Sequence, residues 1–360
     1  MKENIQKPML QTKERDYWFD NAKAFLIIFV VLAHLSEDLI VYTDFSTGDP
    51  LWLNTLYKSI YVFHMPVFLI VSGRFAKKRI DNNDWISVIN KLVVPYIVLQ
   101  TVMMFFYSFT GYASVSRFSY FSPLFGVWYI ITIAVYQLIT PHLKKLKGLF
   151  VIALIVAIVV QFGEAVPFGG FMRLFTHYPF FLLGYYTSGR DLKFCKKPWF
   201  RVLSVLAFIA LFVSVWMLPE YFKVGALTLK RVYSGLTGYF YDLTQAEFLA
   251  FTLIHYLVGF AFFFFTLGIS PTKKTFFSYI GTQSTYIYML HLFFIIFSRS
   301  LAQRFDFLDI FNSDIKAAMY VFAGIPLAFL LASPPVRKAM RWLVAPKFDL
   351  KKLVKKITED

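Results

Sequence analysis

Residues 19–40 read FDNAKAFLIIFVVLAHLSEDLI, and this stretch decides what kind of fold the chain has. A helix that spans a bilayer needs about 20 mostly apolar residues, and this run has that length. It is too long for the core of a secretory signal peptide, and it lacks a clear small-residue cleavage site. The sequence therefore predicts a retained first transmembrane helix that begins near residue 19.

Similar apolar runs follow along the whole chain. Of its 360 residues, 58% are hydrophobic and only 16% are charged, whereas soluble domains carry about 25% charged residues. The sequence predicts an all-α integral membrane protein with about ten transmembrane helices. After the first span, the others are expected near residues 54–73, 92–109, 123–140, 149–163, 171–187, 199–217, 247–269, 276–298 and 317–334.

The net charge of +16 follows the expected membrane topology. Lys and Arg concentrate in the short loops of membrane proteins that stay in the cytoplasm. Here they cluster in alternate segments, within residues 2–15, 74–91, 144–147, 190–201, 273–274 and 337–356. Both termini are therefore expected to be cytoplasmic, which requires an even number of spans. The positive charge needs no nucleic-acid partner to explain it.

Three regions follow from this pattern. Residues 1–18 form a cytoplasmic N-terminal tail, residues 19–335 form one membrane domain, and residues 336–360 form a basic cytoplasmic tail. The basic tail fits either binding to anionic membrane lipid or a plain solvated segment, and the two alternatives stay open.

Ionisable side chains within a bilayer cost several kcal/mol, so each is a functional candidate. In the first helix Lys23 lies roughly 6 Å below the cytoplasmic end and His34 roughly 22 Å. Their separation is close to three helical turns, so both side chains project from nearly the same face. One ligand can therefore touch both residues.

Other polar residues of the expected spans have competing interpretations. His64, His177, His255 and His291 share the depth of His34, where a histidine serves either chemistry or an interhelical hydrogen bond. Arg173 either offers donors to an anionic group or extends to the outer interface. Glu37 and Asp38 follow His34 by three and four residues and either orient its imidazole or form the hydrated helix end, the interpretation we favour. The single cysteine, Cys195, permits neither a disulfide framework nor a cysteine-based zinc site, and we expect no role for it.

The segment from Asp20 to His34 resembles the first helix of the membrane acyltransferase-3 family, in which a basic residue precedes a histidine by this spacing. Residues 63–68, FHMPVF, followed by Ser72 and Gly73, resemble the second-helix signature of its fucose 4-O-acetylase-like branch, although Arg74 stands where that branch usually has an aromatic or aliphatic residue. Three further segments are similar to family motifs: Lys91 with residues 94–96 (VPY), residues 126–129 (GVWY) and residues 285–291 (TYIYMLH). The resemblance covers residues from about 15 to about 335.

The resemblance implies transfer of an acyl group, usually acetyl from cytoplasmic acetyl-CoA, to a hydroxyl of a cell-envelope glycan or a lipid-linked saccharide. Lys23 and Lys91 are then expected to bind the CoA phosphates, and His34 to act as general base. Arg173 or His64 would stabilise the oxyanion or hold the acceptor. Direct transfer and a two-step route through an acylated side chain both remain open.

The same resemblance places the protein in the plasma membrane of a bacterium, with polysaccharide-assembly proteins as candidate partners. We expect no metal and no nucleic acid to be needed. Two other classes compete with the enzyme: a transporter or flippase of a lipid-linked saccharide, with the histidines as a proton relay, and a scaffold subunit with a vestigial site. Retention of both Lys23 and His34, together with the lack of a visible internal repeat, favours the enzyme.

Overall fold

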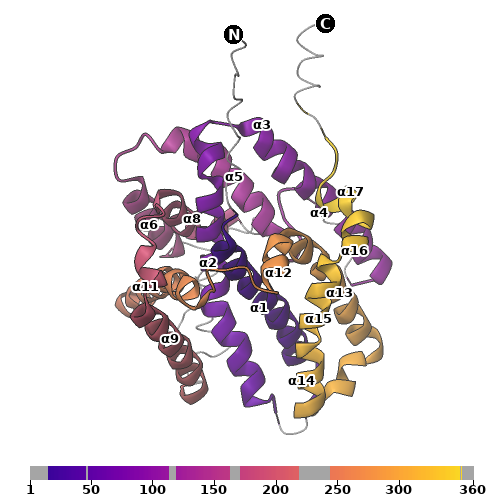
Figure 1. The fold of residues 1–360 in the computed structure, drawn as a ribbon. Coiled ribbons are helices and arrows are strands. Elements are labelled where there is room, and N and C mark those ends of the chain that lie inside the picture. Colours follow the sequence, from indigo (N-terminus) through magenta and orange to yellow (C-terminus); the bar gives the residue numbers. More distant parts are fainter. Residues whose placement is uncertain are drawn as a thin grey trace, which may run out of the picture.

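The computed structural model describes residues 15–45, 48–112, 119–162, 171–218, 244–348 and 350. In these residues all regular secondary structure is helical. Figure 1 shows the helices packed into a single bundle. The predicted all-α membrane fold is confirmed, and the cytoplasmic placement of both termini stays a prediction.

Each expected span contains a helix, but the helices differ in length. Seven segments are long and apolar enough to cross a membrane, and three expected spans are shorter helices. The seven are α1 (Tyr17–Tyr42), α2 (Leu51–Asp81), α3 to α4 (Trp85–Thr110), α9 (Pro198–Met217), α11 (Gln245–Ile269), α13 (Ser284–Phe305) and α14 to α15 (Asp314–Ala332). The shorter ones are α5 (Trp128–Leu143), α6 (Leu149–Val159) and the pair α7 (Phe171–Thr176) and α8 (Tyr178–Tyr186).

Short elements connect these helices. A π-helical turn, η1 (Ile89–Val93), joins α3 (Trp85–Val88) to α4 (Val94–Thr110), and α12 (Ser278–Thr282) precedes α13. After α14 (Asp314–Phe322) and α15 (Gly324–Ala332), the chain continues into α16 (Pro334–Ala339) and α17 (Arg341–Val344). The remaining described turns are η3 (Val160–Phe162), η4 (Lys193–Lys196) and η6 (Phe307–Phe311).

Helices α1 and α2 occupy the centre of the bundle (Figure 1). Helix α1 packs against α2, α12 and α13, and α2 packs against α8 and α11 as well. Apolar side chains of α1 such as Leu26, Ile27 and Val31 are almost completely buried. Residues of α1 can therefore face polar partners from several helices, away from lipid.

Helix α9 lies at the periphery and shows the opposite pattern (Figure 1). Its apolar side chains point outward, with Val202 60%, Leu206 55% and Ile209 53% exposed. Such a continuous apolar face on the outside of a bundle is expected where acyl chains replace water as the solvent.

Two glycines allow α2 and α8 to approach each other closely. A Cβ atom on Gly73 would lie 2.0 Å from the carbonyl oxygen of Phe181, and one on Gly184 would lie 1.8 Å from that of Ile70. Since both neighbours are backbone atoms, neither can rotate away. Small residues at helix contacts increase van der Waals packing in membrane proteins.

We predict that Gly73→Val destabilises the protein by about 1–3 kcal/mol or more, because the new side chain must separate α2 from α8. Gly189→Val is a control, since the nearest atom to a Cβ there is the tip of Arg74 at 3.6 Å. Thermal unfolding in detergent measures the difference. Equal midpoints for the two variants would contradict the close packing of these helices.

Candidate active site

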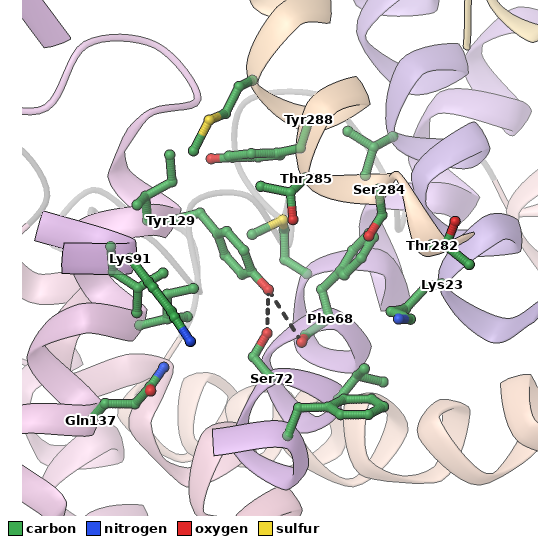
Figure 2. Close-up of a pocket in the computed structure, with 18 of the residues that line it drawn as sticks. Lys23, Phe68, Ser72, Lys91, Tyr129, Gln137, Thr282, Ser284, Thr285 and Tyr288 are labelled. Atoms are coloured by element: carbon green, nitrogen blue, oxygen red, sulfur yellow. Dashed lines mark hydrogen bonds between the residues drawn. The ribbon is translucent and has the colours of Figure 1, made fainter. Parts of the chain in front are cut away.

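A cavity of about 270 Å³ lies between α1, α2, η1, α5, α12 and α13 (Figure 2). Its lining residues come from every sequence segment that resembles a family motif. They include Lys23 and Val30 of α1, Met65, Phe68 and Ser72 of α2, Lys91 of η1, Tyr129 of α5, and Thr285, Tyr288 and Met289 of α13. Segments far apart in the chain thus converge on one cavity.

The cavity is positively charged. Lys23, Lys91 and Arg79 all line it, and none of the described residues in its lining is acidic. Figure 2 shows Lys23 and Lys91 on opposite walls, with Tyr129 between them. Arg79 donates from Nε to Oε1 of Gln137 over 2.8 Å, which fixes its guanidinium at this wall. Such an arrangement suits a ligand that carries several negative charges.

Lys91 owes its position to a proline four residues later. Pro95 has no N–H, so the carbonyl of Lys91 cannot receive the usual α-helical hydrogen bond. The helix widens locally into η1, where the N–H of Val94 bonds to the carbonyl of Ile89, five residues back. Lys91 is the basic residue of this turn, so residues 91–96 (KLVVPY) supply both the cation and the irregular backbone that presents it.

Lys23 is held by its own helix. Its Nζ lies 2.8 Å from Oδ1 of Asp20, and the other carboxylate oxygen of Asp20 accepts from Nε of Arg15 over 2.7 Å. The ammonium also lies 5.0 Å from the ring centre of Phe75, another residue of the cavity wall. These contacts restrict Lys23 to the mouth of the cavity.

Asn21 joins α1 to the segment between α11 and α12. Its Nδ2 donates to the carbonyls of Pro271 (2.8 Å) and Lys273 (2.9 Å). Its Oδ1 accepts from the hydroxyls of Thr275 and Ser278, each at 2.7 Å. The side chain is buried with both of its polar atoms bonded, so Asn21 fixes the depth of Lys23 relative to α12.

Two tyrosines close the inner part of the cavity. The Tyr129 hydroxyl lies 2.6 Å from Oγ of Ser72 and donates to the carbonyl of Phe68 over 3.3 Å (Figure 2). The Tyr288 hydroxyl donates to the carbonyl of Gly126. The two rings contact each other with centres 5.3 Å apart. Residues of three family-like segments, 63–73, 126–129 and 285–291, thus form a polar wall of the cavity.

His34 lies one helical turn beyond Val30, the deepest α1 residue of the cavity lining, and is not itself a lining residue. Its ring stacks on His291 of α13, with centres 5.5 Å apart, and meets Phe125 edge-on at 4.9 Å. His291 in turn lies 6.1 Å from Tyr288 of the cavity wall. His34 is therefore paired with His291, and His291 connects the pair to Tyr288 of the cavity wall.

The carboxylates after His34 are buried, and the expectation of a hydrated helix end is wrong. Asp38 is 0% exposed and Glu37 is 7% exposed. Oε2 of Glu37 lies 3.5 Å from Nδ1 of His34, near enough for an ion pair when the imidazole is protonated. The continuation of α1 to Tyr42 places these residues inside the bundle, because α2, α13 and α14 pack around them.

The other two predicted catalytic residues lie near this pair. His64 contacts the ring of Tyr61 at 4.8 Å, and Tyr61 contacts His34 at 6.4 Å. Arg173 lies over the ring of Trp128 at 4.8 Å, next to Tyr129 in the chain. The Trp128 ring in turn contacts that of Tyr129, with centres 6.2 Å apart. His34 and His64 thus share Tyr61 as a neighbour, and Arg173 lies on the Trp128 side of the bundle.

The remaining histidines and the cysteine have structural surroundings. His177 contacts Thr176 (3.0 Å) and the ring of Trp128, and His255 bonds through Nδ1 to its own helix at Phe251 (2.6 Å). Cys195 of η4 is buried, and burial raises the pKa of its thiol to about 12, which makes it a poor nucleophile. Among the described residues, no three His, Cys, Asp or Glu side chains are grouped to hold a metal ion.

Sequence reasoning missed two arginines. The charge pattern assigns Arg79 to a basic loop within residues 74–91, yet the longer α2 places it in the cavity wall. Arg299 lies just beyond the expected span 276–298, yet α13 extends to Phe305 and Arg299 is only 7% exposed. The signal was available: Arg299 follows His291 by eight residues, which places both on one face of a helix.

A comparison with protein families identifies the family of this chain. A family model described as an acyltransferase domain, acyltransferase-3, matches residues 16–335. The chain belongs to the acyltransferase-3 family. The match covers both the cavity and the His34 region.

The curated relatives are similar over shorter stretches. The nodulation protein NolL of Sinorhizobium fredii is 34% identical over 108 residues, which is 30% of this chain and 28% of that protein. NolL of Mesorhizobium japonicum is 45% identical over 69 residues, or 19% and 17% of the two chains. The chain thus matches less than a third of the length of each relative. No solved structure matches.

We predict that Asn21→Ala destabilises the protein by about 2 kcal/mol or more, because it leaves two hydroxyls and two carbonyls without their partner. Asn54→Ala is the matched control, since Asn54 makes one exposed contact of 3.4 Å with Asp49. Thermal unfolding of both variants in detergent checks this. A loss as small for Asn21→Ala as for the control would refute its role in anchoring α1.

Proposed function

We propose that this acyltransferase-3 protein is a membrane O-acyltransferase that moves an acyl group, acetyl in our proposal, from cytoplasmic acyl-CoA to a hydroxyl of a cell-envelope glycan or lipid-linked saccharide. The observation that carries the proposal is the basic cavity whose lining follows one face of α1 from Lys23 to Val30 and stops one turn before His34. Family membership supports the reaction class.

The donor fits the charge of this cavity. Coenzyme A carries its negative phosphates at one end and its thioester at the other. Lys23, Arg79 and Lys91 offer charge-assisted hydrogen bonds to the phosphates. The volume of about 270 Å³ suits the slender thioester arm, and the nucleotide remains at the mouth. The thioester is then directed along α1 towards Tyr288 and His34.

The chemistry in this proposal centres on His34. Its imidazole takes the proton of the acceptor hydroxyl while the hydroxyl oxygen attacks the thioester carbonyl carbon. The carbon–sulfur bond breaks, and the departing thiolate recovers the proton from the imidazolium. In this proposal Arg173 or His64 stabilises the oxyanion or holds the acceptor. His64 contacts Tyr61, which also contacts His34, and Arg173 lies over the ring of Trp128.

The proposed branch of the family and its acceptor rest on the second-helix residues. Residues 63–68 with Ser72 and Gly73 support a fucose 4-O-acetylase-like branch, in which the acceptor is a sugar hydroxyl. Met65, Phe68 and Ser72 of this segment line the cavity. The relatives from Sinorhizobium fredii and Mesorhizobium japonicum support a bacterial plasma membrane as the location.

We predict that His34→Ala abolishes both CoA release and acetylation of the glycan, because His34 is the proton acceptor in this mechanism. Membranes containing the protein are supplied with acetyl-CoA and the native envelope glycan. Free thiol is measured, and the glycan is analysed by mass spectrometry. His142→Ala, at the exposed end of α5, is the control and keeps full activity.

Equal turnover in His34→Ala and the wild type would remove His34 from the mechanism. No turnover in the wild type with its native glycan would favour the transporter.

We also predict that Lys23→Met and Lys91→Met each raise KM for acetyl-CoA about tenfold, because each removes a charge-assisted hydrogen bond worth about 1.5–3 kcal/mol. The exposed Lys145→Met serves as the control. Initial rates at varied acetyl-CoA concentration measure KM. Unchanged KM in both cavity variants would show that the donor binds elsewhere.

A further inference from the structure

We infer that Arg299 is a positioning residue for His34, acting through Glu37, with Asp38 as the counterion that keeps Arg299 in place. This inference rests on the proposed function, because it assigns the support of the proposed base. Arg299 is not among the described residues that line the basic cavity.

Arg299 bridges both carboxylates that follow His34. Its Nε donates to Oδ1 of Asp38 over 2.6 Å, and its Nη2 donates to Oε2 of Glu37 over 3.3 Å. The guanidinium also lies over the ring of Phe125, with 4.4 Å to the ring centre. Phe125 also contacts His34 edge-on, so the Arg299 guanidinium and the His34 imidazole pack against the same ring.

The two carboxylates have different tasks in this arrangement. Asp38 makes the shorter bond to Arg299 and receives a second one from Tyr320 at 3.3 Å. Glu37 has the longer bond to Arg299 and directs the same Oε2 atom towards Nδ1 of His34, 3.5 Å away. Asp38 therefore takes most of the charge of Arg299, and Glu37 keeps charge available for the imidazole.

Two tyrosines of α2 complete the support of Glu37. Tyr61 donates to Oε2 over 3.1 Å, and Tyr57 donates to Oε1 over 3.4 Å. With Arg299 from α13, both oxygens of Glu37 are held by groups from other helices. The carboxylate cannot turn away from His34 without breaking these bonds.

The charges of Arg299, Glu37, Asp38 and His34 sum to zero when His34 is protonated. With Arg299 positive and both carboxylates ionised, the set carries one net negative charge while His34 is neutral. When His34 takes a proton, the set becomes neutral without movement of any group. Fixed charges that compensate a developing charge in a buried site are a large term in catalysis.

A purely structural role is the competing explanation, in which Arg299 only ties α13 to α1. The two explanations differ in a double-mutant cycle on kcat. If Arg299 acts through Glu37, Arg299→Gln and Glu37→Gln each lower kcat about tenfold to hundredfold, leave KM for acetyl-CoA unchanged, and cost no more together than singly. Arg304→Gln, on the same helix and exposed, is the matched control.

Removing one partner of a buried ion pair can prevent folding, so a second variant removes the charge together with its counterion. Arg299→Met with Asp38→Asn keeps the net charge of the cluster and still deprives Glu37 of its bond. We expect the same loss of kcat in this variant, and no further loss when Glu37→Gln is added.

A readout that needs no turnover separates this inference from the proposed function. Carbethoxylation of His34 by diethylpyrocarbonate, mapped by mass spectrometry, is expected to change at least threefold in Arg299→Gln and by the same factor in Glu37→Gln and in the double variant. His142 provides the internal reference. The positioning role would be overturned if the double variant lost as much kcat as the product of the two single losses. An unchanged rate of reaction of His34 with diethylpyrocarbonate in Arg299→Gln would overturn it as well. A wild type without acyl transfer but with the expected reaction pattern would overturn only the proposed function.

Discussion

A charged side chain inside a membrane bundle must find an opposite charge or a water-accessible cavity, because neither lipid nor packed apolar side chains can solvate it. This constraint determines the arrangement around α1. Lys23 pairs with Asp20 at the mouth of the cavity, and Arg299 pairs with Asp38 deeper in the bundle. Glu37 accepts hydrogen bonds from Tyr57 and Tyr61 and forms a longer ion pair with Arg299. His34 lies between these paired regions, beside Glu37, whose ion pair with Arg299 at 3.3 Å is longer than those of Asp20 and Asp38.

The same helix therefore connects two environments with different chemistry. Near its start, α1 borders a cavity with cations and without acidic lining residues among those described. Three turns later it borders a closed region of histidines, tyrosines and paired charges. Tyr288 connects the two, because it lines the cavity and contacts His291, which stacks on His34. The proposed sites for an anionic donor and for a proton acceptor thus lie along one face of α1, as our proposal of acyl transfer to a hydroxyl requires.

Much of this could be predicted from the sequence, because apolar run length determines the spans and helical spacing determines which α1 residues share a face. The position of Lys91 beside a proline and that of the paired glycines between α2 and α8 also have local causes. The helix ends were harder. Glu37, Asp38, Arg79 and Arg299 all lie where polar residues normally mark the end of a span. Only packing against other helices shows that α1, α2 and α13 continue and bury them. The pairing of His34 with His291 likewise depends on tertiary contacts that spacing cannot give.

The central claim is that the basic cavity delivers an acyl-CoA thioester to His34. The most direct test is an experimental structure of the protein in lipid nanodiscs with bound acetyl-CoA. We predict phosphate density at Lys23, Arg79 and Lys91, and the thioester between Tyr129, Tyr288 and Val30, pointing towards His34. Coenzyme A bound outside this cavity, or with its thioester directed away from α1, would contradict the account.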